Sequence, residues 1–206
     1  MADRRMIHVV DDEEALRRSV GFLLKTSGYD VTPWASGAAF LKEITAGAAG
    51  CVLMDVRMPE MDGLEVHRRM VERGIGLPVI VLTGHGDVAM AVAAMKQGAV
   101  DFLEKPFEKA ALLGAIDHAF ERIENARAAR TRAEEAELRI AVLTDRERDV
   151  LDGLARGLPN KTIAHTLDIS PRTVEVHRAH LMTKLDVRSF SDALRLAFAA
   201  GYGEAA

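Results

Sequence analysis

The first 120 residues alternate short apolar runs with longer amphipathic stretches. The apolar runs predict strands at Met6–Val10, Tyr29–Pro33, Cys51–Asp55, Val79–Thr83 and Val100–Leu103. The amphipathic stretches predict helices at Glu13–Thr26, Ala38–Thr45, Gly63–Arg73, Val88–Gln97 and from Glu108 onward. Apolar strands without alternation, each followed by a crossover helix, are typical of a parallel sheet with helices on both faces. We therefore expect a doubly wound α/β domain around five parallel strands.

Residues at the predicted helix ends support these bounds. Gly28 and Gly98 follow their helices in the way that C-cap glycines do. Asp62 and Glu65 have the spacing of a capping box, which indicates that the third helix begins beside them.

A stretch without glycine or proline runs from Phe120 to Ile140. Its interspersed charges and many alanines favour continuous helix. The apolar stripe through Ile116 and Ile123 is interrupted at Arg127, so a coiled coil over the whole stretch stays an open alternative. The predicted organisation is an α/β domain at residues 1–122, a helical linker at 123–142 and a smaller all-helical domain at 143–206.

The hydrophobic pattern of residues 143–206 differs from that of the first 120 residues. Thr144 and Glu147 have capping-box spacing at the start of a helix that reaches Ala155. The next predicted helices run from Pro159 or Asn160 to Leu167, from Pro171 to Leu185 and from Ser189 to Ala200. A short turn separates the first two of these, and Pro171 suits the first position of a helix. Helix, short turn and second helix form the helix-turn-helix pattern.

Composition narrows the class of protein. The chain of 206 residues is 49% hydrophobic and 28% charged. Its longest apolar runs fall well short of the ~20 residues that a bilayer-spanning helix needs. The first apolar run leads directly into four acidic residues, unlike a secretory signal, so we expect a soluble, cytoplasmic protein with no membrane partner. The single cysteine, Cys51, excludes an internal disulfide and predicts a small buried apolar side chain.

Charge is distributed unevenly along the chain. Residues 1–120 hold the acidic excess behind the formal net charge of -4, whereas residues 143–206 have equal numbers of acidic and basic side chains. A neutral domain is not a bulk nucleic-acid binder, so any DNA contact there must come from a local arrangement of cations.

Polar residues suited to phosphate chemistry stand at the strand ends. Asp11 and Asp12 end the first strand, Asp55 the third and Thr83 the fourth, and Lys105 follows the fifth. Carboxyl ends of parallel strands meet at one edge of the sheet, and three carboxylates there need a cation, for which Mg²⁺ is suited. We expect Asp55 to attack a phosphoryl group while the metal, Lys105 and Thr83 stabilise its oxygens. The product is an aspartyl phosphate.

These residues, with the loop from Asp55 to Gly63 and the pair Lys105-Pro106, resemble the motif of the response-regulator receiver domain throughout this half of the chain. The resemblance implies a flavodoxin-like fold with Asp55 as phosphoacceptor. It further implies that Asp12, Asp55 and the carbonyl of Arg57 ligate Mg²⁺, that Asp11 supports the metal through water, and that Lys105 pairs with the phosphate. It gives Thr83 and Phe102 the role of switch residues, and places His85 with Arg57 at the pocket mouth.

An enzyme that hydrolyses an aspartyl phosphate is the alternative for the first domain. Such an enzyme typically carries a second Asp two residues after the nucleophile as general acid and base, but that residue here is Arg57. The phosphoryl group should therefore persist, which suits a switch better than a turnover enzyme.

The helix from Pro171 shows one apolar face. Val174, Leu181 and Leu185 line that face, which leaves Arg172, Glu175, Val176, Arg178 and Ala179 nearer the open side, where we expect the major groove of DNA. The residues expected to contact phosphates are Lys161, Thr173, His177, His180 and Lys184. Glu147 would repel phosphates, so we expect it to cap its helix or to form an internal ion pair with Arg172 or Arg178.

Residues 143–203 resemble the LuxR-type DNA-binding domain through Leu143–Glu147, Leu158–Ala164 and Ile169–His177. The two halves together resemble the FixJ/NarL class of transcriptional regulators, nearer to the FixJ branch in residues 83–88 and 101–107. The resemblance implies phosphorylation by a sensor histidine kinase and binding of double-stranded promoter DNA, with RNA polymerase as a candidate partner. It also implies homodimerisation upon phosphorylation, through a face that includes Val88, Val92, Met95, Lys96 and Phe102. A phosphotransferase without DNA binding would not need the groove-facing helix, and a constitutive DNA-binding protein would not need the acidic quartet with Lys105.

Overall fold

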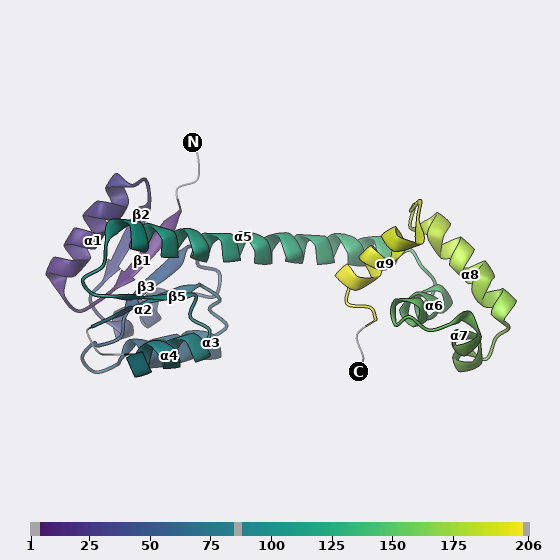
Figure 1. Ribbon diagram of the computed structural model, residues 1–206, viewed down its shortest axis with the longest axis horizontal. Coiled ribbons are helices and arrows are strands. Elements are labelled where there is room, and N and C mark those ends of the chain that lie inside the picture. The colour runs from purple at the N-terminus through teal and green to yellow at the C-terminus, as the bar shows by residue number, and fades with distance from the viewer. Residues whose placement is uncertain (1–4, 85–87, 204–206) are drawn as a thin grey trace. The chain divides into compact units, whose positions relative to one another are not determined.

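The computed structural model describes residues 5–84 and 88–203. The chain divides into two compact units, Met1–Glu124 and Asn125–Ala206, which are described separately (Figure 1). The division falls within one long helix, α5 (Lys109–Ile140), whose two halves belong to different units.

The first unit is built on a parallel sheet. Its strands are β1 (Met6–Val10), β2 (Asp30–Trp34), β3 (Cys51–Asp55), β4 (Val79–Thr83) and β5 (Asp101–Glu104). They lie in the order β2-β1-β3-β4-β5, and every neighbouring pair is parallel. Three of the predicted strands have their expected bounds, while β2 and β5 each begin and end one residue later. Pairing sets the start of β2, because Asp30 lies opposite Met6, the first residue of β1.

Helices cover both faces of the sheet, as predicted (Figure 1). They are α1 (Glu14–Thr26), α2 (Gly37–Glu43), α3 (Gly63–Glu72), α4 (Val88–Lys96) and the first half of α5. On one face α1 and α5 bury Leu24 and Ile116 against Val9 of β1 and its neighbours. On the other face α2 and α3 bury Phe40 and Met70 against the opposite sides of the same strands. Alternate strand residues thus enter two separate cores, which explains why the strands are apolar throughout.

One polar side chain is built into the second of these faces. His8 of β1 is buried, and its Nδ1 accepts a hydrogen bond from Trp34 Nε1 at 3.3 Å while Nε2 lies 3.2 Å from the Ala49 carbonyl. This pattern requires a neutral ring with its proton on Nε2. Burial lowers the pKa of His8, against the opposing effect of the Ala49 carbonyl.

The second unit is helical. Besides the last part of α5 it contains α6 (Asp145–Ala155), α7 (Asn160–Leu167), α8 (Pro171–Lys184) and α9 (Phe190–Ala199). All four form at the predicted places, with α9 one residue shorter at each end than expected. Ile140 of α5 is buried with Val150, Leu181 and Ala197 in a single core, and Ala136 of α5 is buried as well. The end of the predicted linker therefore packs as part of this unit.

The predicted caps are present with one difference. Thr144 and Glu147 form the complete capping box of α6. Asp62 caps α3 by accepting a hydrogen bond from the Glu65 backbone N–H at 2.7 Å. The expected capping box is incomplete, because the Glu65 carboxylate does not accept from the Asp62 backbone N–H. It is bound instead by the guanidinium groups of Arg68 and Arg69.

Candidate functional site

Five residues of the expected phosphate site lie at one edge of the sheet. Asp11 and Asp12 follow β1, Asp55 and Thr83 are the last residues of β3 and β4, and Lys105 follows β5. Because β1, β3, β4 and β5 are consecutive parallel strands, their carboxyl ends converge there.

The charged groups of this edge are in direct contact. Lys105 Nζ lies 2.8 Å from Asp11 Oδ2 and 3.1 Å from Asp55 Oδ1. Asp11, Asp12 and Asp55 each offer a carboxylate oxygen, and these oxygens lie within 4.8 Å of one another. Asp11 and Asp55 are buried, whereas Asp12 is exposed at the mouth. One ammonium group against three carboxylates leaves a net negative pocket of hard oxygen ligands, which fits a divalent cation such as Mg²⁺.

The surroundings raise the pKa of both Asp55 and Lys105. Burial raises the pKa of Asp55, and the charge of Asp11 adds to the rise, while Lys105 opposes it. Burial alone would lower the pKa of Lys105, but its bonds to Asp11 and Asp55 outweigh that effect and raise it. The lysine therefore stays cationic beside Asp55.

Asp11 is held in place by three groups. Its Oδ1 accepts a hydrogen bond from the Glu13 backbone N–H at 2.8 Å, its Oδ2 accepts one from Lys105, and its carbonyl accepts one from Arg17 Nη1 at 2.6 Å. These contacts fix the orientation of the Asp11 carboxylate within the cluster. The role of Arg17 was not predicted from the sequence. Its only signal is an arginine one turn into the helix that follows the acidic pair.

The loop after Asp55 is closed tightly against the strand. The Gly63 backbone N–H donates to the Val56 carbonyl at 2.9 Å. A Cβ added at Gly63 would lie 2.2 Å from the Asp55 carbonyl oxygen, which is backbone and cannot rotate away. Glu60 in the same loop has a φ of 64°, in the left-handed region that non-glycine residues seldom adopt. The local backbone is thus shaped to present the Asp55 side chain at the edge.

The two expected switch residues differ in burial. Thr83 is buried, and its hydroxyl donates a 3.4 Å hydrogen bond to the Leu103 carbonyl. Phe102 is 45% exposed on β5, beside Val92 and Met95 of α4.

The expected dimer face contains an open apolar cavity of about 380 Å³, which is lined by Ala91, Val92, Met95, Lys96 and Phe102. Four of the five residues of the expected dimer face therefore lie together, while the side chain of Val88, and all of His85, lie outside the described residues.

The predicted helix-turn-helix is formed by α7 and α8. Ser170 caps α8 by accepting from the Thr173 backbone N–H, and Pro171 occupies the first turn as predicted. Val174, Leu181 and Leu185 are buried as expected. Of the expected DNA-contacting residues, Lys161, Arg172, Glu175, Val176, His180 and Lys184 are exposed, whereas Thr173, His177 and Arg178 are partly buried.

Two cations of α8 are engaged within the unit. The Arg178 guanidinium lies over the Phe190 ring, 4.1 Å from its centroid. Arg178 was expected on the open side, but it is half-buried because its guanidinium packs on Phe190, the first residue of α9. Lys184 Nζ lies 2.7 Å from Glu147 Oε2.

Glu147 forms an internal ion pair, as predicted, but the expected partners Arg172 and Arg178 are wrong. The partner is Lys184, because α8 crosses α6 where the last turn of α8 meets the first turn of α6. Glu147 also accepts a hydrogen bond from the Thr144 backbone N–H at 2.8 Å. Although burial raises the pKa of Glu147, Lys184 and Thr144 outweigh it and lower the pKa to about 2.

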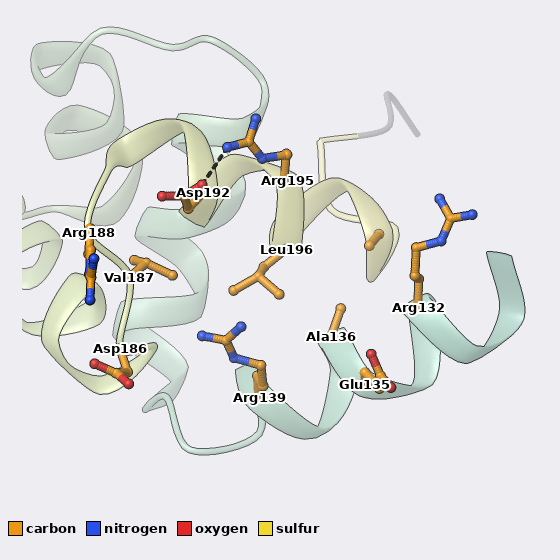
Figure 2. Close-up of a pocket in the computed structure, with 11 residues that line it drawn as sticks. Arg132, Glu135, Ala136, Arg139, Asp186, Val187, Arg188, Asp192, Arg195 and Leu196 are labelled. Carbon is orange, nitrogen blue, oxygen red and sulfur yellow. Dashed lines mark hydrogen bonds and ion pairs between the residues drawn. The ribbon is translucent and has the colours of Figure 1, made fainter. Parts of the chain in front are cut away.

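A further cavity of about 500 Å³ lies in the second unit between the last turns of α5, the loop at residues 186–188 and α9 (Figure 2). Ala136 and Leu196 face one another across it, and arginines of both helices stand at its rim. Arg139 donates to the Leu185 carbonyl at the end of α8, and Arg195 pairs with Asp192. No pattern in the sequence predicts this cavity, because it forms between segments some 50 residues apart in the chain.

In the part of the chain that the structure describes, no helix combines the length and the apolar character that crossing a membrane requires.

Comparisons with known proteins agree with this architecture. Residues 7–117 match the model of the response regulator receiver domain, and residues 141–197 match that of the luxR family of bacterial regulatory proteins. The chain is 47% identical over 201 residues to the transcriptional regulatory protein FixJ of Bradyrhizobium diazoefficiens, covering 98% of each chain.

Two solved structures are similar over nearly the whole chain. The response regulator StyR has a TM-score of 0.70 at 38% identity, with 95% of this chain and 99% of that chain covered. Full-length FixJ from B. japonicum has a TM-score of 0.61 at 47% identity, with 97% and 98% covered.

Proposed function

This chain belongs to the response-regulator family that joins a receiver domain to a LuxR-type DNA-binding domain, and we propose that Asp55 is its phosphoacceptor. The protein is a transcriptional regulator activated by phosphorylation. The observation that carries the assignment is the position of the Asp55 carboxylate, 3.1 Å from Lys105 Nζ and beside the carboxylates of Asp11 and Asp12.

The proposed reaction is an in-line displacement. An oxygen of the Asp55 carboxylate forms a bond to phosphorus as the bond to the donor's leaving group breaks, and the leaving group keeps the electron pair. Lys105 stands where its positive charge stabilises the transferred oxygens. The Thr83 hydroxyl, which donates a hydrogen bond to the Leu103 carbonyl in this structure, would donate instead to an oxygen of the phosphoryl group on Asp55, at the end of the neighbouring strand.

The carboxylate cluster fits Mg²⁺. Asp12 and Asp55, with the carbonyl of Arg57, would hold the ion directly, and Asp11 would support it through water, as the receiver-domain motif implies. When bound, the ion neutralises phosphoryl charge that Lys105 alone does not balance.

The family is one of regulators rather than of enzymes in the ordinary sense. For this chain we propose a single transfer without turnover, supported by Arg57 at the position where a hydrolytic enzyme would carry its general base. The proposed donor is a sensor histidine kinase.

Activation is proposed to pass through the face around Phe102. Movement of Thr83 toward the phosphoryl group leaves space for the Phe102 ring, which changes the apolar surface formed with Val92, Met95 and Lys96. A second copy of the chain would cover this surface, and the dimer would place two copies of α8 on double-stranded promoter DNA. We place these events in the cytoplasm, with RNA polymerase as a further partner.

Phosphoryl incorporation tests the assignment. Incubation with acetyl phosphate and Mg²⁺ should add one phosphoryl mass to the full chain, as measured by intact-mass spectrometry. Asp55→Asn and removal of the metal by a chelator should each abolish it. Asp62→Asn is the matched control, since Asn caps α3 as well as Asp does and the change lies in the same loop. Incorporation into Asp55→Asn at the wild-type level would refute the assignment.

A footprint on genomic DNA tests whether phosphorylation strengthens DNA binding. Phosphorylated protein should protect discrete sites at a lower concentration than unphosphorylated protein, and Asp55→Asn should show no such difference. Equal protection in both states would contradict activation by phosphorylation.

A further inference from the structure

We propose that Arg17 of α1 is a positioning residue of the phosphorylation site, and that it raises the affinity for Mg²⁺ by fixing the peptide unit between Asp11 and Asp12. The inference rests on the proposed function, in which the carboxylate cluster holds the ion. It goes further by assigning a role in metal binding to a residue outside that cluster.

Arg17 reaches back over the first turn of α1 to the end of β1. Its backbone N–H donates to the Glu13 carbonyl at 3.1 Å, so its main chain is fixed within the helix. Arg17 is partly buried, and its Nη1 donates to the Asp11 carbonyl at 2.6 Å. Helical side chains lean toward the N-terminus of their helix, which brings an arginine at this position within reach of the preceding loop. The contact therefore ties the loop that carries the acidic pair to α1.

The bond from Arg17 acts on the backbone that carries Asp12. The Asp11 carbonyl and the Asp12 N–H belong to one planar peptide unit, so a bond that fixes the carbonyl limits rotation of the whole unit. The preceding part of Asp11 is already fixed, because its N–H donates to the Trp34 carbonyl at 3.2 Å and its carboxylate accepts two hydrogen bonds. Arg17 extends this order to the start of Asp12.

Asp12 depends on its backbone for its position. One of its carboxylate oxygens lies within 4.8 Å of oxygens of Asp11 and Asp55, yet the residue is exposed. Within residues 5–84 and 88–203, no group forms a hydrogen bond or an ion pair with the Asp12 carboxylate. A loosely held ligand loses conformational entropy when an ion binds, so a fixed peptide unit should favour binding.

The charge of Arg17 has the opposite effect from its contact. A guanidinium beside the site repels a divalent cation. The Arg17 guanidinium is bound to a neutral carbonyl, and no acidic side chain among the described residues forms an ion pair with it. Loss of the charge alone would therefore strengthen Mg²⁺ binding, whereas loss of the contact would weaken it, so the sign of the change separates the two effects.

The test compares two neighbouring arginines of α1. Arg17→Met keeps the apolar part of the side chain but has no N–H to donate to the loop. Arg18→Met is the matched control, because it removes the same charge from the next residue, which pairs with Glu14 at 2.6 Å. Arg17→Ala is a second variant that also removes the bond. Circular dichroism at 222 nm checks that each variant is folded.

Isothermal titration calorimetry of the full chain with MgCl₂, in the absence of a phosphodonor, measures the affinity directly. Arg17→Met and Arg17→Ala should each bind Mg²⁺ about tenfold more weakly than wild type. This is the low end of the effect of groups that orient metal ligands, because Arg17 holds backbone rather than a ligand side chain. Arg18→Met should bind Mg²⁺ at least as tightly as wild type, because an exposed charge is screened by salt.

Phosphorylation by acetyl phosphate gives a second readout. Arg17→Met should need about tenfold more Mg²⁺ for half-maximal rate, and it should reach the wild-type rate once Mg²⁺ is saturating. A rate that stays low at saturating Mg²⁺ would show that Arg17 acts on the transfer itself and would overturn the inference.

The inference also falls if Arg17→Met binds Mg²⁺ as tightly as wild type or more tightly, or if Arg18→Met loses as much affinity as Arg17→Met. In these cases wild type still binds Mg²⁺ and accepts the phosphoryl group, so the proposed function stands. If wild type neither binds Mg²⁺ nor gains a phosphoryl mass, the proposed function fails, and the inference fails with it.

Discussion

Replacing Glu147 by Gln should destabilise the DNA-binding unit and leave the receiver unit unchanged. Gln at this position still accepts a hydrogen bond from the Thr144 backbone N–H, as in capping boxes that use Gln. The change therefore removes the charge that binds Lys184 while keeping the cap of α6.

The size of the effect follows from the pKa of Glu147. A pKa of about 2 against the usual 4.5 corresponds to ~3 kcal/mol of stabilisation of the folded state. Glu147 is only 3% exposed, but the Lys184 side chain is 39% exposed, so water screens the pair. We therefore expect the free energy of unfolding to fall by about 1–2 kcal/mol at pH 7.

The pH dependence gives a second signature. Because folding lowers the pKa of Glu147, its contribution is fully present above pH 4.5 and is lost as the pH falls from about 4.5 toward about 2. The difference between wild type and Glu147→Gln should accordingly be largest at pH 7 and shrink markedly by pH 3.

Urea unfolding of the full chain measures both effects. Circular dichroism at 222 nm follows the helices of both units, whereas the fluorescence of Trp34, the only tryptophan, follows the receiver unit alone. The variant should shift the first signal and not the second, and Glu137→Gln on the exposed side of α5 should shift neither. Wild-type stability of Glu147→Gln at pH 7, or an unchanged difference at pH 3, would refute the reasoning.

Further predictions concern the receiver unit. Gly63→Ala should lower the free energy of unfolding by about 2–4 kcal/mol, because the new Cβ would collide with the Asp55 carbonyl oxygen. Urea titrations followed by Trp34 fluorescence measure this change. A variant as stable as wild type would show that the loop moves to accommodate the added Cβ. His8 has a lowered pKa, so its stabilising contribution is present above pH 6.5 and declines as the pH falls below that value. Wild type should therefore lose more stability between pH 7 and pH 5 than His8→Gln, and parallel losses would contradict this. Val92→Asp should keep phosphorylated protein monomeric in sedimentation velocity, where wild type should dimerise.

Buried strands and their ends could be read directly from the sequence. A strand covered on both faces is apolar throughout, so the run Val79–Thr83 was unambiguous, and parallel order places Asp11, Asp55 and Lys105 at one edge. The one-residue shifts of β2 and β5 depend on pairing register, which the strand's own residues do not specify.

Partners of long polar side chains could not be predicted in the same way. Lys184 and Arg178 differ from their expected roles because the crossing of α8 with α6 brings Lys184 to Glu147, while Phe190 at the start of α9 lies against Arg178. The contact of Arg17 with the Asp11 carbonyl likewise depends on the path of the chain between β1 and α1. Such contacts leave no periodic pattern in the sequence, whereas the residues that fill a core do.

The equal numbers of acidic and basic side chains in residues 143–206 have a consequence for how this regulator searches a genome. Affinity for random DNA comes from cations that displace counterions from phosphates, and residues 143–206 carry no excess of them. Arg178 and Lys184 are moreover held by Phe190 and Glu147. We therefore expect the protein to bind random DNA weakly, so that chromosomal DNA takes up little of the free pool. On that expectation, occupancy of a promoter follows the abundance of the phosphorylated form closely and falls when the phosphoryl group is lost.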